Sequence, residues 1–231
     1  MATAPDYYRN VFINCPFDAE FRPLFLAIVF TVADCGFVPR CALEADDSGD
    51  VRIQKIMRII ELCCYGIHDI SRTEATVFTE ADGSHEALPR FNMPPELGMF
   101  IGAHRFGGAT QKRKKYLVFD TGRFRYRKFI SDLAGQDIKA HNWNNTAPET
   151  KKEQAIRSTV VGVRDWLNTK REDLLAAGQR LTGGPLIATR YREFREILPE
   201  LAEAYGQEEA TLTFYDLVGL IQSWLQANPQ P

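Results

Sequence analysis

One glutamate of the chain, Glu96, stands where a carboxylate could do chemistry. It lies in the segment NMPPELG, residues 92–98, in which Asn92 is expected to cap a helix and two prolines fall in the first turn. The unpaired N–H groups and the dipole of a helix N-terminus favour an ionised carboxylate by about 0.3–1 kcal/mol. A fixed, ionised Glu96 would act as a nucleophile or as a counter-charge to an oxocarbenium-like sugar, with Asn92 orienting it or contacting ribose. The simpler alternative is that Glu96 only complements the dipole.

Further candidate residues follow the apolar runs that read as strands. The first strand leads into Asn14, Cys15, Pro16 and Phe17, the second into Arg40, the third into Asp69, Ser71 and Arg72, and the fourth into Asp120. Ligands of open α/β sheets bind beyond the carboxyl ends of the strands, so we expect these side chains to converge on one edge. Asp69 would bind ribose hydroxyls or place a proton on a leaving base, although a strand-end aspartate more commonly forms a turn.

Lysine and arginine are interleaved with aromatic residues between positions 112 and 129. One interpretation is a solvated face beside a buried strand, which is typical of short charge runs. The other is a phosphate site in which arginine forks hold an anion and Phe124 or Tyr126 stacks on a base. Nucleic-acid binding ranks behind both, because the formal net charge of the whole chain is only -2.

No metal and no cofactor is predicted. The loop at 44–50 is rich in acidic residues that could hold a divalent cation, but their spacing is not that of an EF-hand, and Asp50 as a helix cap explains part of the cluster. The five cysteines show no CxxC spacing, and the adjacent Cys63 and Cys64 would not face one point.

The elements that position these residues alternate between apolar runs and helical patterns, which indicates βαβ units. The fold class predicted is α/β, with a flavodoxin-like five-stranded parallel sheet, helices on both faces and a C-terminal helical extension. Residues 71–91 are expected to form a long loop. The helix at 51–64 is expected to turn these residues inward: Ile53, Ile56, Met57, Ile60 and either Cys63 or Cys64. Strands are expected at 11–13, 37–41, 65–70, 116–119 and 137–140, and helices at 18–35, 51–64, 92–104 and 126–133.

A change of pattern after Asn142 divides the chain into an α/β domain at 1–145 and a helical extension at 146–231. Helices are expected at 151–175, 190–205 and 213–226, and their surface would suit a homo-oligomer or a partner protein.

The chain as a whole reads as a cytoplasmic protein without a membrane segment. The N-terminal residues are polar and lack the apolar region of a secretory signal, and the longest apolar stretch, 25–33, falls far short of the roughly 20 residues that span a bilayer. An odd number of cysteines fits reduced thiols in a cytosol.

Three short motifs together resemble the nucleoside 2-deoxyribosyltransferase family and the related nucleotide N-hydrolases and TIR-like domains. They are Asn14-Cys15-Pro16-Phe17 after the first strand, Asp69-Ile70-Ser71 after the third, and NMPPELG at 92–98, and the resemblance covers about residues 10 to 141. It implies that Glu96 is the catalytic carboxylate and that Asp69 and Asn92 contact the sugar or base. The bulky Phe17 and the long 71–91 segment depart from the transferases and leave the substrate open.

The leading hypothesis is therefore an enzyme that cleaves or transfers the N-glycosidic bond of a nucleotide, deoxynucleotide or NAD-type dinucleotide. The resemblance implies, by analogy, a role in bacterial anti-phage defence, but a fold alone does not confer a function. Residues 14–17 would line the pocket, and Arg40 and Arg72 would contact substrate, with Arg72 on phosphate. The alternative is a non-catalytic nucleotide sensor that signals to a partner through its C-terminal helices.

Overall fold

The computed structural model describes residues 6–44, 49–79, 81–89, 91–170 and 181–230 of the chain. Five strands form one parallel sheet in the order β2-β1-β3-β6-β7. They are β1 (Asn10–Asn14), β2 (Val38–Cys41), β3 (Tyr65–Asp69), β6 (Lys115–Asp120) and β7 (Lys139–Ala140). Every residue of β1 and β3 is buried, as expected of central strands covered on both faces.

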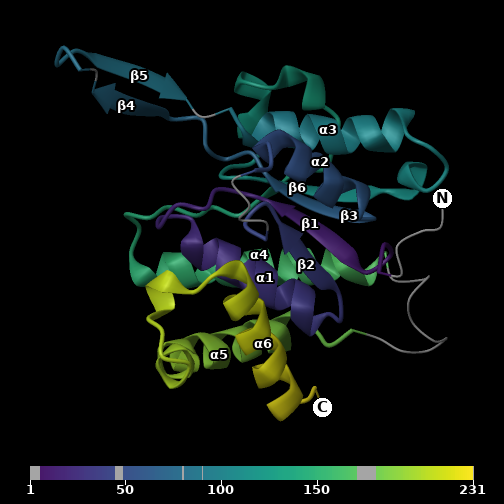
Figure 1. Ribbon diagram of the computed structural model, residues 1–231, viewed down its shortest axis with the longest axis vertical. Helices are drawn as coiled ribbons and strands as arrows, with labels where there is room; N and C mark the ends of the chain where they lie inside the picture. The colour runs from purple at the N-terminus through teal and green to yellow at the C-terminus, as the bar shows by residue number, and fades with distance from the viewer. Residues whose placement is uncertain (1–5, 45–48, 80, 90, 171–180, 231) are drawn as a thin grey trace.

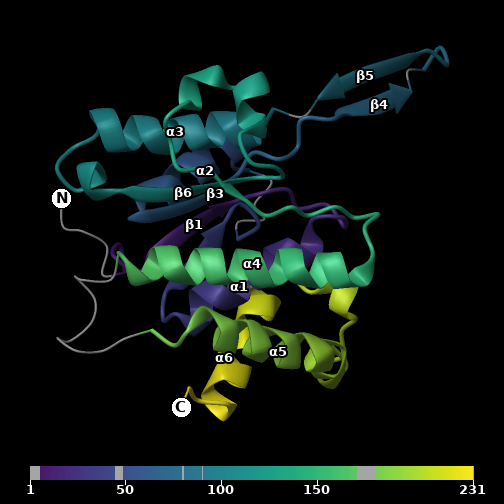
Figure 2. The same cartoon turned by 180° about the vertical axis from the view of Figure 1, so that it is seen from behind.

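Helices cover both faces of the sheet (Figure 1). On one face lie α2 (Arg52–Glu61) and α3 (Met93–Phe106), and on the other lie α1 (Arg22–Asp34) and α4 (Glu149–Asn168). A further layer, α5 (Gly184–Ala204) and α6 (Phe214–Ala227), packs against α1 and α4 on the side away from the sheet, which Figure 2 shows from behind. The predicted α/β class with a five-stranded parallel sheet and C-terminal helices is confirmed.

The C-terminal helices share a hydrophobic core with the sheet. Phe30 of α1 stacks on Phe194 of α5 at 5.3 Å between ring centroids and lies 5.6 Å from the ring of Trp224 in α6. The helix α4, which the sequence analysis assigned to the extension, packs on α1, and a Cβ at Gly162 would lie 3.5 Å from the Phe119 ring of β6. Helix α1 is therefore covered by the sheet on one side and by α5 and α6 on the other.

The segment 71–91 was expected to be a loop, and the structure corrects this. It contains an antiparallel hairpin of β4 (Ala75–Thr79) and β5 (His85–Pro89), which projects from the body of the molecule (Figure 1). Within the described residues the two strands pair only with each other, and Val77 and Leu88 stay exposed. Without a buried face, the hairpin leaves no clear hydrophobic period in the sequence.

Other expected elements also differ. The predicted helix at 126–133 is two short 3-10 turns, η2 (Arg125–Lys128) and η3 (Ser131–Leu133), separated by Phe129 and Ile130 with φ values of -135° and -137°. Ile53 and Met57 of α2 were expected to face inward but are 38% and 51% exposed. The apolar residues of α2 occupy more of its surface than one packed face can cover. Further 3-10 turns are η1 (Gln111–Arg113) and η5 (Glu209–Thr211).

Two predicted segments, the helix at 151–175 and the acidic loop at 44–50, lie partly outside the described residues. Helix α4 ends at Asn168, whereas the prediction ran to 175, and most of the acidic loop at 44–50 falls in the gap at 45–48. Among the helices described, none is both long and apolar enough to cross a membrane.

Candidate functional site

The strand order places the candidate site between β1 and β3. The chain runs from β1 outward to β2 and then returns to β3 on the other side of β1, so the connections diverge at this pair. Ligands of doubly wound sheets bind at such a switch point, beyond the carboxyl ends of the strands. Asn14 and Asp69 are the last residues of β1 and β3, and the Asn14 Nδ2 donates a hydrogen bond to the Met93 carbonyl at the start of α3 (2.9 Å). This bond attaches the first turn of α3 to the switch point.

Glu96 lies in that first turn and is buried, with 7% of its surface exposed. No hydrogen bond to its carboxyl group is found in the described part of the chain. Burial raises the pKa of Glu96 to about 7, against an opposing effect of the positive charge of Arg52. The helix dipole was expected to favour the ionised carboxylate, and burial acts in the opposite direction, with a desolvation cost larger than the effect of the dipole. A carboxyl group with a pKa near neutral can both accept and release a proton.

The electrostatics of Cys15 show that Glu96 lies near the ends of the strands. Its thiol is buried, and burial together with the negative charges of Asp69, Asp18 and Glu96 raises the pKa of Cys15 well above its usual value. The carboxylates of three separate segments therefore act on the residue that follows β1. Pro16 is buried and Phe17 packs against Phe25 with a centroid distance of 5.4 Å, so the turn after β1 fills space more than it lines a pocket.

Asn92 directly precedes α3, as predicted, but its side chain does not cap the helix. Its backbone is already helical, with φ -66° and ψ -40°, and its side chain is exposed and makes no capping hydrogen bond. A capping side chain needs an extended backbone at its own residue, which Asn92 lacks. Gly98, two residues after Glu96, faces open space, since an added Cβ would meet no atom within 4 Å.

Asp69 is held in a buried network and is 1% exposed. Its Oδ1 accepts hydrogen bonds from the Ser71 backbone N–H (2.9 Å) and hydroxyl (2.5 Å), and its Oδ2 lies 3.1 Å from the Nε2 of His141. The Nδ1 of His141 accepts a hydrogen bond from the Trp143 N–H, so in the neutral ring the proton is on Nε2. The Nε2 and Oδ2 atoms are at ion-pair distance, but their direction is too poor for a hydrogen bond within the described residues. Asp69 therefore positions Ser71 rather than reaching a surface itself.

A second network joins the end of β6 to the end of β3. The Arg125 Nε donates to the Asp120 Oδ1 (2.8 Å), and its other nitrogens donate to the Ser71 carbonyl and to the Thr73 hydroxyl, each at 2.6 Å. Burial raises the pKa of Asp120, while Arg125 lowers it. Asp120 was expected at this edge because it follows a strand, whereas His141 was not predicted, although it directly follows the last strand and so carried the same signal.

Two predicted binding residues are already paired with acids. Arg40 forms an ion pair with Glu44 (2.7 Å), and Arg72 forms ion pairs with Asp18 (2.5 Å) and Glu20 (3.0 Å). Of the predicted residues, Arg40 and Arg72 are thus paired with acids, and Asn92 is exposed. The residues gathered near the switch point are Asn14, Cys15, Asp69, Ser71 and Glu96.

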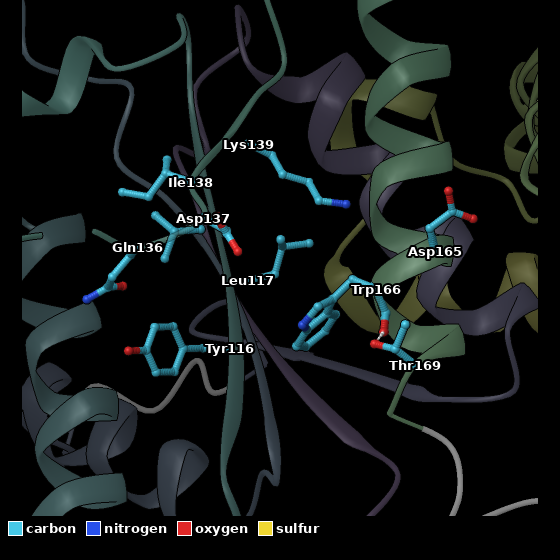
Figure 3. A pocket seen from close by; sticks show the side chains of 10 residues that line it. Tyr116, Leu117, Gln136, Asp137, Ile138, Lys139, Asp165, Trp166 and Thr169 are labelled. Atoms are coloured by element: carbon cyan, nitrogen blue, oxygen red, sulfur yellow. Dashed lines mark hydrogen bonds between the residues drawn. The ribbon is translucent and has the colours of Figure 1, made fainter. Parts of the chain in front are cut away.

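Two cavities lie away from these residues. One of about 570 Å³ follows the edge of β6 where β7 pairs only with Phe119 and Asp120, and Figure 3 shows Leu117 and Trp166 on the same side of the strand, with Tyr116 on the other. The second, of about 730 Å³, lies between α4 and α5 beside Trp143. Neither cavity is lined by any of the ten residues predicted to form the site. Across the described ranges, no group of three or more His, Cys, Asp or Glu side chains is placed to hold a metal ion.

The fold and the strand-end residues define a doubly wound α/β protein with an acidic group at its switch point. Comparison of the chain with protein-family models, with curated proteins and with solved structures gave no match.

Proposed function

We propose that this protein cleaves or transfers the N-glycosidic bond of a nucleotide, deoxynucleotide or NAD-type dinucleotide. The observation that carries the proposal is the buried carboxyl group of Glu96, which lies in the first turn of α3, beside the end of β1, with a pKa of about 7 and no hydrogen bond among the described residues. Strongly perturbed carboxyl groups at a switch point are candidates for catalysis.

In the proposed reaction, the ionised form of Glu96 attacks the anomeric carbon of the pentose. The bond between this carbon and the base breaks, and the base leaves with the electron pair; a base that leaves as an anion takes up a proton from solvent, whereas nicotinamide leaves neutral. Water or a second base then attacks the same carbon and gives its proton to solvent, the glycosyl ester breaks, and the Glu96 carboxylate is released. Water gives a hydrolase and a second base gives a transferase.

The neighbouring residues act mainly by positioning. Asn14 holds the first turn of α3 through the Met93 carbonyl, and Asp69 holds the Ser71 hydroxyl, which is the nearer of the two to the surface. Ser71 would then contact the sugar. Asn92, which is exposed one turn before Glu96, would contact the sugar or base.

The experiment is incubation of the purified chain with NAD and a panel of ribonucleotides and deoxynucleotides, followed by chromatography for free base or nicotinamide. We expect base release by the wild-type protein and by the variant Glu200→Gln, since Glu200 is an exposed residue of α5. The variant Glu96→Gln should still bind nucleotide but release no base. Recovery of every nucleotide intact, with binding unchanged in all three proteins, would contradict the proposal and would fit a non-catalytic sensor.

A further inference from the structure

The loop after β6 holds an exposed aromatic residue in a strained conformation. Phe124 has φ +62° and ψ 7°, in the left-handed region that residues with a side chain seldom adopt, and 48% of its surface is exposed. Such strain costs of order 1–3 kcal/mol and persists only where the surrounding structure enforces it. A phenylalanine that is about half exposed gains only part of the burial energy that could offset that cost, so the conformation calls for a further explanation.

The residues on the C-terminal side of Phe124 are held in place by the rest of the structure. Arg125 is tied to Asp120, to the Ser71 carbonyl and to the Thr73 hydroxyl, and Tyr126 is 1% exposed in the core. The loop is therefore anchored to the ends of β3 and β6, at the same edge of the sheet as the proposed reaction site.

Two arginines lie against the Phe124 ring. The guanidinium carbon of Arg123 is 5.0 Å from the ring centroid and that of Arg127 is 4.6 Å from it. A guanidinium group that stacks on a ring by its flat face keeps the N–H groups along its edge free to donate hydrogen bonds. Both arginines and the adjacent Lys128 are exposed, and none of their three side chains forms an ion pair or hydrogen bond with any residue in the described ranges.

This lack of partners distinguishes the loop from other arginine positions at the same edge. Arg40 is paired with Glu44, Arg72 with Asp18 and Glu20, and Arg125 with Asp120. The formal net charge of the chain is -2, so the unneutralised cations of the loop are a local feature. Two guanidinium groups beside one ring offer N–H donors of the kind that phosphate oxygens accept.

We propose that Arg123, Phe124 and Arg127 form a clamp for the phosphate group of a nucleotide, in which the two arginines donate to phosphate oxygens and the phenylalanine positions them. This inference rests on the proposed function and names its substrate class, a phosphorylated nucleotide rather than a free nucleoside. Lys128 adds a third positive charge beside the clamp.

The test is calorimetric titration of the full chain with adenosine 5′-monophosphate, adenosine, inorganic phosphate and a single-stranded oligonucleotide of about 20 nucleotides, a length that exceeds a typical single-strand binding site. We expect the monophosphate to bind at least about tenfold tighter than adenosine, because charge-assisted hydrogen bonds are the strong ones. The double variant Arg123→Ala/Arg127→Ala should lose that preference. The control Arg105→Ala, at an exposed arginine of α3 that has no ion pair among the described residues, should keep it.

The role of Phe124 is tested separately. Phe124→Leu should weaken binding of the monophosphate roughly tenfold, since an aliphatic side chain cannot hold the two guanidinium groups by cation–π contacts. Phe124→Trp, which keeps an aromatic ring, should bind the monophosphate as tightly as wild type. Circular dichroism spectra of all variants confirm that each is folded. Equal affinity of Phe124→Leu and wild type would overturn the positioning role.

Three results would overturn the nucleotide assignment: equal affinity for adenosine and its monophosphate, equal affinity for inorganic phosphate and the monophosphate, or tighter binding of the oligonucleotide that the double variant abolishes. The outcome is separable from that of the proposed reaction. A phosphate preference without base release would refute the proposed glycosidase reaction and support the phosphate clamp. Base release without a phosphate preference would support the reaction and refute the clamp.

Discussion

Replacement of Glu96 by glutamine tests the burial of this carboxyl group through protein stability, without any substrate. Glutamine has nearly the same shape but cannot ionise, so the change removes only the cost of holding a charge in this position. In the folded protein the pKa of Glu96 is raised from its usual value of 4.5 to about 7. This shift of the pKa means that the free energy of unfolding is about 3 kcal/mol higher when Glu96 is fully protonated than when it is fully ionised.

The sign follows from linkage. Because the folded pKa lies above the unfolded one, the favourable contribution of protonated Glu96 is complete below pH 4.5 and is lost as the pH rises through about 7. Glu96→Gln should therefore gain stability relative to wild type as the pH rises. The gain should be small at pH 4.5 and should approach about 3 kcal/mol at pH 8.5.

The assay is urea unfolding followed by circular dichroism at pH 4.5, 6.5 and 8.5, for wild type, Glu96→Gln and the exposed control Glu200→Gln. The control should differ from wild type by the same small amount at every pH. If the stability difference between Glu96→Gln and wild type does not change with pH, the carboxyl group is not desolvated and the reasoning fails.

Three further predictions concern the packing around the site. At Gly66 an added Cβ would lie 2.6 Å from the His68 Nε2, so Gly66→Ala should lower the free energy of unfolding by about 1–3 kcal/mol. At Gly98 of α3 an added Cβ would meet open space, so Gly98→Ala should raise the free energy of unfolding by about 0.5–1 kcal/mol. Urea unfolding that gives the opposite order of stability would contradict this prediction. Burial and the charge of Lys114 lower the pKa of His68 to about 3, so stability should fall as the pH drops below about 6.5, and an NMR titration should show a neutral ring at pH 5; a midpoint near 6.5 would refute it. Arg125→Met should cost about 3–5 kcal/mol by leaving buried Asp120 without its cation, and a loss below about 0.5 kcal/mol in the same unfolding assay would be inconsistent with the network.

The fold was predictable because its signals are local. Apolar runs marked the buried strands β1 and β3, and the prolines of NMPPELG marked the first turn of α3. The convergence of Asn14, Asp69 and Glu96 followed from one rule about strand ends, and their placement around the switch point agrees with it.

The protonation of Glu96 was not predictable in the same way. The helix dipole is a property of the first turn and can be read from the sequence, whereas desolvation depends on which distant segments cover the side chain. The same holds for Arg40 and Arg72, whose acidic partners take up the charge that was expected to meet a substrate. The hairpin of β4 and β5 escaped prediction because it packs against no core that would impose a period.

The pH dependence of base release tests the central claim most directly. On whichever nucleotide the wild-type protein cleaves, kcat/KM should rise with pH through a midpoint near 7, as Glu96 ionises in the free protein, and Glu96→Gln should lower the rate by orders of magnitude at every pH. An unchanged rate and an unchanged midpoint in Glu96→Gln would contradict the account, as would the absence of base release from every nucleotide offered.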